Sequence, residues 1–286
     1  MSKQSRESRV INGIWVISEG FTLYAFIKCV AQAQIINALL SALTLLFLAI
    51  PRLLEHRLPI RLHPAVHVLV MCFTSGPLLG DVYQFYYLIP WWDLLLHLQS
   101  GFLAALAGYY LTDGLDWPNR HHSTALHHTL ALTTALAVGV VWEFLEYGGD
   151  CLLPTDMQQA TLVSSIHSYR LGSDTGEVGH IRQIQSVLIN GSTPAWGSAY
   201  LDIGLHDTMT DLLSGAAGAL SYSLLQDLTR RRRPWVEILP QPEQAAKPGP
   251  KPGAPPAVTA STGSFTDSGP QTHNKWHARR GDRPGC

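Results

Sequence analysis

The sequence is poor in charged residues. They make up 14% of its 286 residues, while 46% of the residues are hydrophobic. Soluble domains carry about 25% charged residues, so this shortage favours a membrane protein. The formal net charge of −1 does not by itself indicate a partner, and no nucleic-acid partner is expected.

Cysteine is scarce as well. The four cysteines, Cys29, Cys72, Cys151 and Cys286, are too scattered for a zinc-ligand spacing or a disulfide framework. No serine or cysteine nucleophile motif and no glycine-rich phosphate loop is visible. A cleavable signal peptide is not expected either, because the first apolar stretch contains Glu19 and lacks a small-residue cleavage site. We interpret that stretch as a retained first span.

Long apolar segments are abundant. Runs such as 40–50 and 129–141 are apolar all round, which speaks against the alternative of a soluble helical core. A bilayer is crossed by about 20 apolar residues. The sequence therefore predicts an all-α fold, a polytopic membrane helical bundle with about six transmembrane helices at 10–30, 34–50, 64–80, 91–111, 129–147 and 203–225.

Lysine and arginine residues predict the orientation of these spans. They gather before the first span, between the second and third, at Arg120, and at 230–233, whereas the alternate connections hold few of them. Cytoplasmic loops carry the excess of positive charge, so both termini are expected in the cytoplasm. The lipid bilayer of a plasma membrane, the bacterial inner membrane, is the expected location.

Two domains are expected. Residues 1–233 form the transmembrane domain, with a long outer loop at 148–201. Residues 234–286 are rich in proline, glycine and polar residues and cannot bury enough apolar surface to offset chain entropy. They are predicted to be a disordered cytoplasmic tail.

Ionisable residues recur inside three of the spans. Their spacings, i,i+4 for Asp93 and His97, i,i+3,i+7 for Glu143, Glu146 and Asp150, and i,i+4 for Asp207 and Asp211, place each set on one helix face. The predicted topology brings all three sets to one depth near the outer surface. Charged groups in a span are costly unless they face the protein interior, so we expect the sets to meet. Gly101, Gly108 and Gly215 would allow close helix approach.

Converging carboxylates cannot all stay charged without counter-ions. A divalent metal ion would supply the charge, and Mn, Fe, Zn or Mg suits oxygen-rich ligation with a histidine. The candidate metal ligands are Asp93, His97, Glu143, Glu146, Asp207 and Asp211, and His206 or Asp150 could serve as catalytic acid or base. Taken singly, each set also has a structural explanation: an interhelical hydrogen bond, an ordinary helix-end contact, or a helix cap by Asp207.

The motif order resembles a known family. Asp93-x-x-x-His97-x-x-x-Gly101, Glu143-x-x-Glu146-Tyr147 and Asp207-Thr208-x-x-Asp211-Leu212 are similar to the pattern of the YjdF-like bacterial inner-membrane proteins of unknown function. More distantly, the first element resembles VanZ-like membrane proteins. The resemblance covers about residues 64–225 and implies a multi-spanning architecture with a shared polar site.

Three functions fit these observations. The first is a metal-dependent enzyme that acts on a lipid or lipid-linked envelope substrate. The second is a cation- or proton-coupled transporter, although transporter sites usually lie nearer the bilayer midplane. The third is a structural membrane protein whose polar cluster only specifies helix packing.

Overall fold

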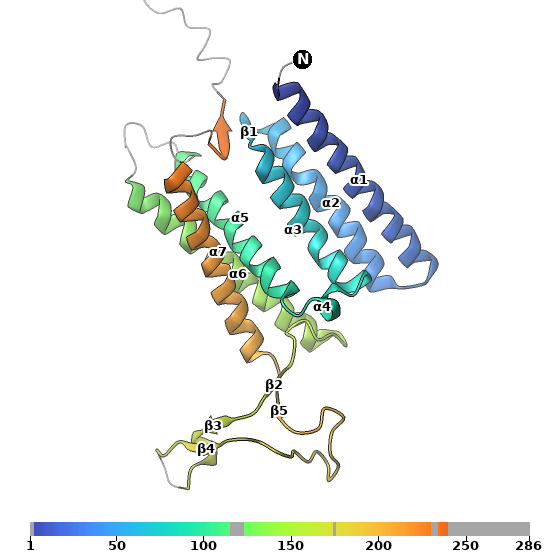
Figure 1. Cartoon of the computed structure of the whole chain (residues 1–286), viewed down its shortest axis with the longest axis vertical. Coiled ribbons are helices and arrows are strands. Elements are labelled where there is room, and N and C mark those ends of the chain that lie inside the picture. Colours follow the sequence, from blue (N-terminus) through green and yellow to red (C-terminus); the bar gives the residue numbers. More distant parts are fainter. Residues whose placement is uncertain (1–2, 115–122, 174–175, 230–233, 240–286) are drawn as a thin grey trace, which may run out of the picture. The chain divides into compact units, whose positions relative to one another are not determined.

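The computed structural model describes residues 3–114, 123–173, 176–229 and 234–239. This part of the chain is mostly helical, and successive long helices run in alternating directions (Figure 1). The long helices are α1 (Lys3–Ala31), α2 (Ile35–Arg57), α3 (Pro64–Val82), α5 (Trp92–Gly114), α6 (Thr124–Leu152) and α7 (Leu205–Thr229), and α4 (Phe85–Leu88) is a single turn.

The long helices form two groups of three. Helices α1, α2 and α3 pack on one another, as do α5, α6 and α7, and α3 packs against α5 to join the groups (Figure 1). Two side-chain hydrogen bonds hold this joint. The Trp92 indole Nε1 donates to the Gly76 carbonyl at 3.1 Å, and Gln99 Nε2 donates to the Leu69 carbonyl at 2.8 Å.

Glycines bring α5 and α7 into backbone contact. A Cβ atom added at Gly101 would overlap the backbone of Gly215, and one added at Gly218 would overlap the carbonyl of Leu98. Gly108 lies close to α6, where an added Cβ atom would overlap Thr134 and the carbonyl of Leu130. The expected role of small residues in close helix approach is thus confirmed.

Five helical segments of the described chain are long and apolar enough to cross a membrane: Arg9–Ala31, Ile35–Arg57, Pro64–Val82, Trp92–Thr112 and Thr124–Leu152. Helix α7, the predicted sixth span, is long enough at 25 residues but is less apolar because it carries three aspartates. The total of six spans and the location of the termini stay predictions.

The expectation of an all-α fold is too narrow, because short antiparallel strand pairs accompany the helices. Strands β2 (Thr161–Val163) and β5 (Tyr200–Asp202) pair, as do β3 (Ile166–Ser168) and β4 (Gly179–Ile181). Both pairs lie in the connection between α6 and α7. This connection spans residues 153–204, later than the expected 148–201, because α6 continues through Leu152.

The third strand pair lies at the opposite end of the bundle. Strand β1 (Ile60–Leu62) pairs with β6 (Val236–Ile238), and the ring of Trp235 lies 5.8 Å from that of Phe102. The packed part of the chain therefore reaches Leu239, past the predicted domain boundary at 233. The rest of the predicted disordered tail, residues 240–286, lies outside the described residues.

Candidate metal centre

Buried ionisable side chains from α5, α6 and α7 meet at the end of the bundle nearest the 153–204 connection. His97, Glu143, Glu146 and Asp211 are each at most 7% exposed, and each offers one ligand atom within 4.8 Å of the others. Metal–ligand bonds of about 2.0–2.5 Å allow ligand atoms to lie about 4–5 Å apart across one ion. The four groups therefore have the separation and chemistry of a first coordination shell.

A second set shares Asp211 with the first. One oxygen each of Asp93, Asp207 and Asp211 also lie within 4.8 Å of one another. His97 links the two sets, since its Nε2 is 3.5 Å from Asp211 Oδ2 and 3.9 Å from Asp93 Oδ1. The expected convergence of the six residues is thus confirmed, while the binding of a metal by them is still a prediction.

Carboxylate oxygens of this cluster are buried without a hydrogen bond. They include Glu146 Oε2 and Asp211 Oδ2, on side chains that are 5% and 2% exposed. The other Glu146 oxygen, Oε1, accepts a hydrogen bond of 2.7 Å from the Trp142 indole. A buried carboxylate oxygen without a donor costs free energy. A cation bound between these oxygens would remove that cost.

The 153–204 connection covers the cluster with two glutamines. The Gln159 amide Nε2 donates to Asp93 Oδ2 at 2.8 Å, and the Gln159 backbone N–H donates to Asp207 Oδ2 at 3.0 Å. Gln158 Nε2 donates to Thr208 Oγ1 at 2.7 Å, and Gln158 and Thr208 are both polar neighbours of Glu143. These two residues could not be singled out from the sequence, because a neutral amide in a polar connection has no free-energy cost that a reader of the sequence could recognise.

Asp150, predicted as a catalytic acid or base, belongs to neither ligand set. Its Oδ1 accepts hydrogen bonds from Thr155 Oγ1 and the Met157 backbone N–H, and its Oδ2 accepts one from the Gln158 backbone N–H. These bonds of 2.7–2.8 Å fold the turn that presents the two glutamines. Asp150 thus positions the covering segment.

His206, the other predicted acid or base, also lies outside both sets. Its side chain is exposed at the first turn of α7, and its backbone N–H donates to Asp202 Oδ2 at 2.6 Å. It directly precedes Asp207 in the chain, and its side chain is open to solvent.

Tyr86 on α4 is a further neighbour that the sequence did not reveal. Burial and then the nearby Asp93 carboxylate raise its pKa above the usual range, so its phenol remains a proton donor. Its ring packs onto Gly80, where a Cβ atom would overlap it. The aromatic composition of this stretch indicated a membrane interface but not proximity to the cluster.

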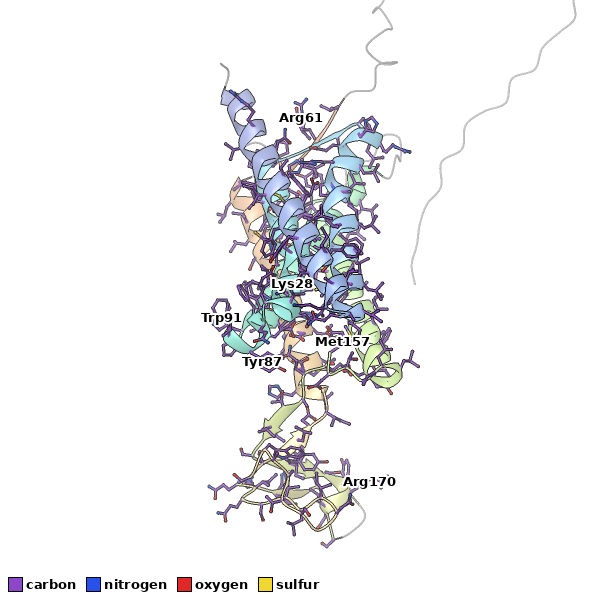
Figure 2. All side chains as sticks on the ribbon, turned by 90° about the vertical axis from the view of Figure 1, so that its right-hand side faces the viewer. Lys28, Arg61, Tyr87, Trp91, Met157 and Arg170 are labelled. Carbon is purple, nitrogen blue, oxygen red and sulfur yellow. The ribbon has the colours of Figure 1, made fainter. Side chains whose placement is uncertain are left out.

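Aromatic side chains mark the same end of the bundle. Tyr87 and Trp91 are 88% and 58% exposed and project from the bundle near Lys28, with Arg61 at the opposite end (Figure 2). Tyrosine and tryptophan are enriched where a bilayer meets water. The cluster therefore lies close to the level expected for a membrane interface.

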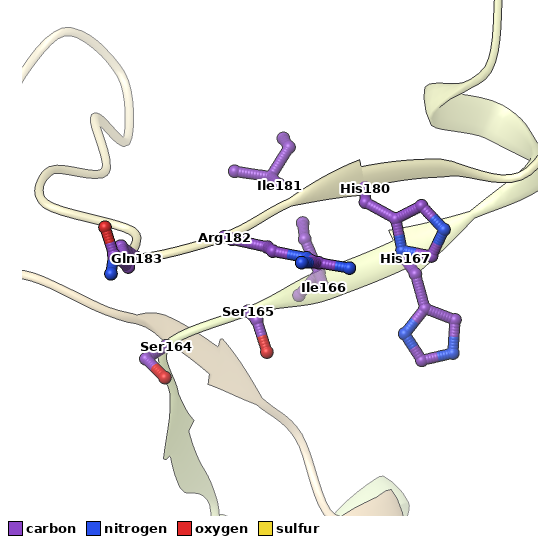
Figure 3. A pocket seen from close by; sticks show the side chains of 8 residues that line it. All are labelled: Ser164, Ser165, Ile166, His167, His180, Ile181, Arg182 and Gln183. Carbon is purple, nitrogen blue, oxygen red and sulfur yellow. The ribbon is translucent and has the colours of Figure 1, made fainter.

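A cavity of about 430 Å³ lies elsewhere, on the β3–β4 strand pair. His167 and His180 face each other across the two strands there, with ring centroids 5.8 Å apart, and Arg182 lies beside them (Figure 3). No carboxylate of the cluster lines this cavity. The centre and the cavity are separate features.

Apolar helices around a buried carboxylate and histidine cluster define a multi-spanning membrane protein of the helical-bundle class. The chain belongs to the family described as Predicted membrane protein (DUF2238), whose model matches residues 14–232. No curated protein and no solved structure matches the chain. The family description supports the membrane assignment and states no activity, so the function has to be inferred from the cluster.

Proposed function

We propose that the protein is a metal-dependent membrane enzyme that acts on a lipid or lipid-linked envelope substrate. The observation that carries this proposal is the convergence of His97, Glu143, Glu146 and Asp211 within 4.8 Å, buried and contributed by three helices. Such a ligand set suits a divalent ion of the Mn, Fe, Zn or Mg type. When bound, the ion would activate water or polarise a phosphoryl or acyl oxygen.

The chain's own residues then have separate tasks. His97, Glu143, Glu146 and Asp211 would hold the ion, with Asp93 and Asp207 beside them. His206, exposed next to Asp207, is positioned to exchange a proton with solvent. Asp150 fixes the turn carrying Gln158 and Gln159, which limits access of water to the cluster.

A purely structural role for the cluster is less consistent with its hydrogen bonding. Polar groups that specify helix packing are normally satisfied by one another. Here Glu146 Oε2 and Asp211 Oδ2 accept no hydrogen bond although they are buried. Unsatisfied acceptors that point to one place are better explained by a ligand.

The location of the centre supports a membrane substrate. Tyr87 and Trp91 lie near the same end of the bundle, where lipid headgroups would be within reach (Figure 2). We further propose six spans with both termini in the cytoplasm of a bacterium, which would put the centre at the outer face of the inner membrane. Reporter fusions at Arg120 and at Gly176 test this, with cytoplasmic and external signals expected, respectively.

We further propose that the YjdF-like proteins share this site. If this chain and the YjdF-like proteins have the same architecture, the Asp-x-x-x-His, Glu-x-x-Glu and Asp-x-x-x-Asp elements of both should supply the same ligands. Metal analysis of a YjdF-like protein and of its variant at the matching histidine would test this.

Activity is best tested in nanodiscs made with bacterial lipid extract. Mass spectrometry should detect a lipid conversion that requires added Mn²⁺, is lost in Glu143→Gln and persists in Glu177→Gln, where the exposed carboxylate lies outside the cluster. Absence of any metal-dependent conversion would contradict the enzyme proposal. Cation or proton flux in proteoliposomes that vanishes in Glu143→Gln would favour the transporter alternative instead.

A further inference from the structure

The charge of the cluster exceeds what one divalent ion can neutralise. Asp93, Glu143, Glu146, Asp207 and Asp211 provide five carboxylates. Asp93 and Asp211 both pair with the same histidine, His97. The arginines Arg52 and Arg61 pair elsewhere, with Glu19 and Glu237. One divalent ion would leave three carboxylates uncompensated in a poorly hydrated place, whereas two ions would leave one.

The geometry provides two positions. The set of His97, Glu143, Glu146 and Asp211 and the set of Asp93, Asp207 and Asp211 have Asp211 in common. Its Oδ2, on a side chain that is 2% exposed, accepts no hydrogen bond. A shared carboxylate of this kind bridges two ions about 3.5–4 Å apart in two-metal enzymes.

The two proposed ion positions differ in the hydrogen bonds that their carboxylates already accept. Glu146 Oε2 of the first set has no donor. In the second set, Asp93 and Asp207 each accept a hydrogen bond from Gln159, one from its amide group and one from its backbone N–H. Gln159 thus provides two neutral donors to the two carboxylates that a second ion would bind.

We propose a two-metal centre bridged by Asp211, in which Gln159 competes with the second ion for Asp93 and Asp207. The proposal rests on the proposed metal dependence and extends it. The first ion is resident, and the second binds when Gln159 releases at least its side-chain bond to Asp93. Paired ions that stabilise the attacking and leaving oxygens suit displacement at phosphorus, so the substrate class is a phosphate ester or diphosphate of a membrane lipid.

Manganese provides the test. The purified full-length protein, stripped with chelator, is titrated with Mn²⁺, and bound metal and the electron paramagnetic resonance spectrum are recorded. Two ions per chain with an exchange-coupled spectrum are expected. One ion with an isolated-ion spectrum would overturn the two-metal centre and leave the metal-dependent enzyme standing. Two uncoupled ions would overturn the bridge, and no bound ion would overturn both proposals.

Single substitutions test which residues form the second ion position. Asp207→Asn and, as a second route if that variant does not fold, Asp93→Asn should each bind one ion and lose the coupling. Asp227→Asn is the matched control, since Asp227 lies on the same helix about 24 Å from Asp211 at 1.5 Å per residue. Retention of two coupled ions in both cluster variants would overturn the assignment.

Gln159→Ala tests the competition. Loss of one hydrogen bond to Asp93 should tighten binding of the second ion about fivefold and leave the first unchanged. Gln158→Ala is the control for loosening of the connection, because its side chain donates to Thr208. Equal effects of the two variants, or weaker binding in Gln159→Ala, would contradict the competition.

Discussion

The two groups of helices differ in how their carboxylates are neutralised. In the group of α1, α2 and α3, Glu19 and Glu55 lie beside basic side chains of the same group. Glu19 binds Arg52 at 3.1 Å, and Glu55 lies 3.3 Å from His67 and also accepts the Leu62 backbone N–H. Arg52 in turn lies over the ring of Trp15, 4.9 Å from its centroid. These charges have their partners within the chain.

In the cluster formed by α5, α6 and α7, carboxylates outnumber the basic side chains. Five carboxylates of the cluster share one histidine, and buried oxygens of Glu146 and Asp211 have no donor. Both groups belong to the same apolar bundle, so the membrane alone does not explain the difference. We infer that the first arrangement stabilises the fold by itself and that the second is completed by a cation from outside the chain.

The largest effect is expected where the second group depends on backbone contact. Gly101→Ala places a Cβ atom into the backbone of Gly215, which should separate α5 from α7 and cost about 3 kcal/mol of unfolding free energy. His97 and Asp211 face each other across this contact, so metal binding should fall as well. Thermal unfolding in detergent measures the first effect.

Gly20→Ala in α1 is the matched control, because nothing lies within 4 Å of a Cβ atom there. It should leave the unfolding temperature unchanged or slightly raise it, since alanine is the better helix former. Equal destabilisation by the two substitutions would contradict the inferred dependence of the second group on backbone contact.

A smaller effect is expected at the strand pair that ties the two groups together. Deletion of residues 234–286 removes β6 together with Trp235, and it exposes the surface that Val236 covers. Burial of one such side chain contributes about 2 kcal/mol, so the unfolding temperature should drop. Deletion of residues 240–286 keeps this strand and should leave the unfolding temperature unchanged. Identical unfolding of the two truncated proteins would show that the strand pair does not stabilise the bundle.

The smallest expected effect is a change in unfolding free energy that has opposite signs in the two groups of helices. In chelator, Arg52→Gln should destabilise the protein by about 1 kcal/mol, because Glu19 loses its partner in a half-exposed pair. Glu146→Gln should instead stabilise the metal-free protein by about 1 kcal/mol, since it removes one of several repelling carboxylates. Unfolding curves recorded in chelator compare the two, and destabilisation by both would argue against uncompensated charge in the cluster.

The sequence predicted those features whose free-energy cost can be recognised from the residues alone. Asp93, His97, Glu143, Glu146 and Asp211 stand out because ionisable residues in apolar helices need a reason. Their helical spacing and the topology then brought them together. Five of the six predicted spans match helices that are long and apolar enough to cross a membrane.

Other features were not predictable because they depend on distant residues. The pairing of Glu19 with Arg52 joins positions 33 residues apart, and β6 pairs with a strand that precedes it by most of the chain. Gln159 lies in a polar connection where nothing distinguishes it from its neighbours. Asp150 fitted the helical spacing of Glu143 and Glu146, but the turn that it binds could not be foreseen.

Metal content of the purified protein tests most directly whether a cation completes the carboxylate cluster. The comparison uses one histidine from each group of helices. His97 and His67 are both 7% exposed and both lie beside a carboxylate, so their replacement by alanine is matched in burial and chemistry. We predict bound divalent metal in the wild type and in His67→Ala, and its loss in His97→Ala. Negligible metal in all three proteins, or equal metal in the two variants, would contradict it.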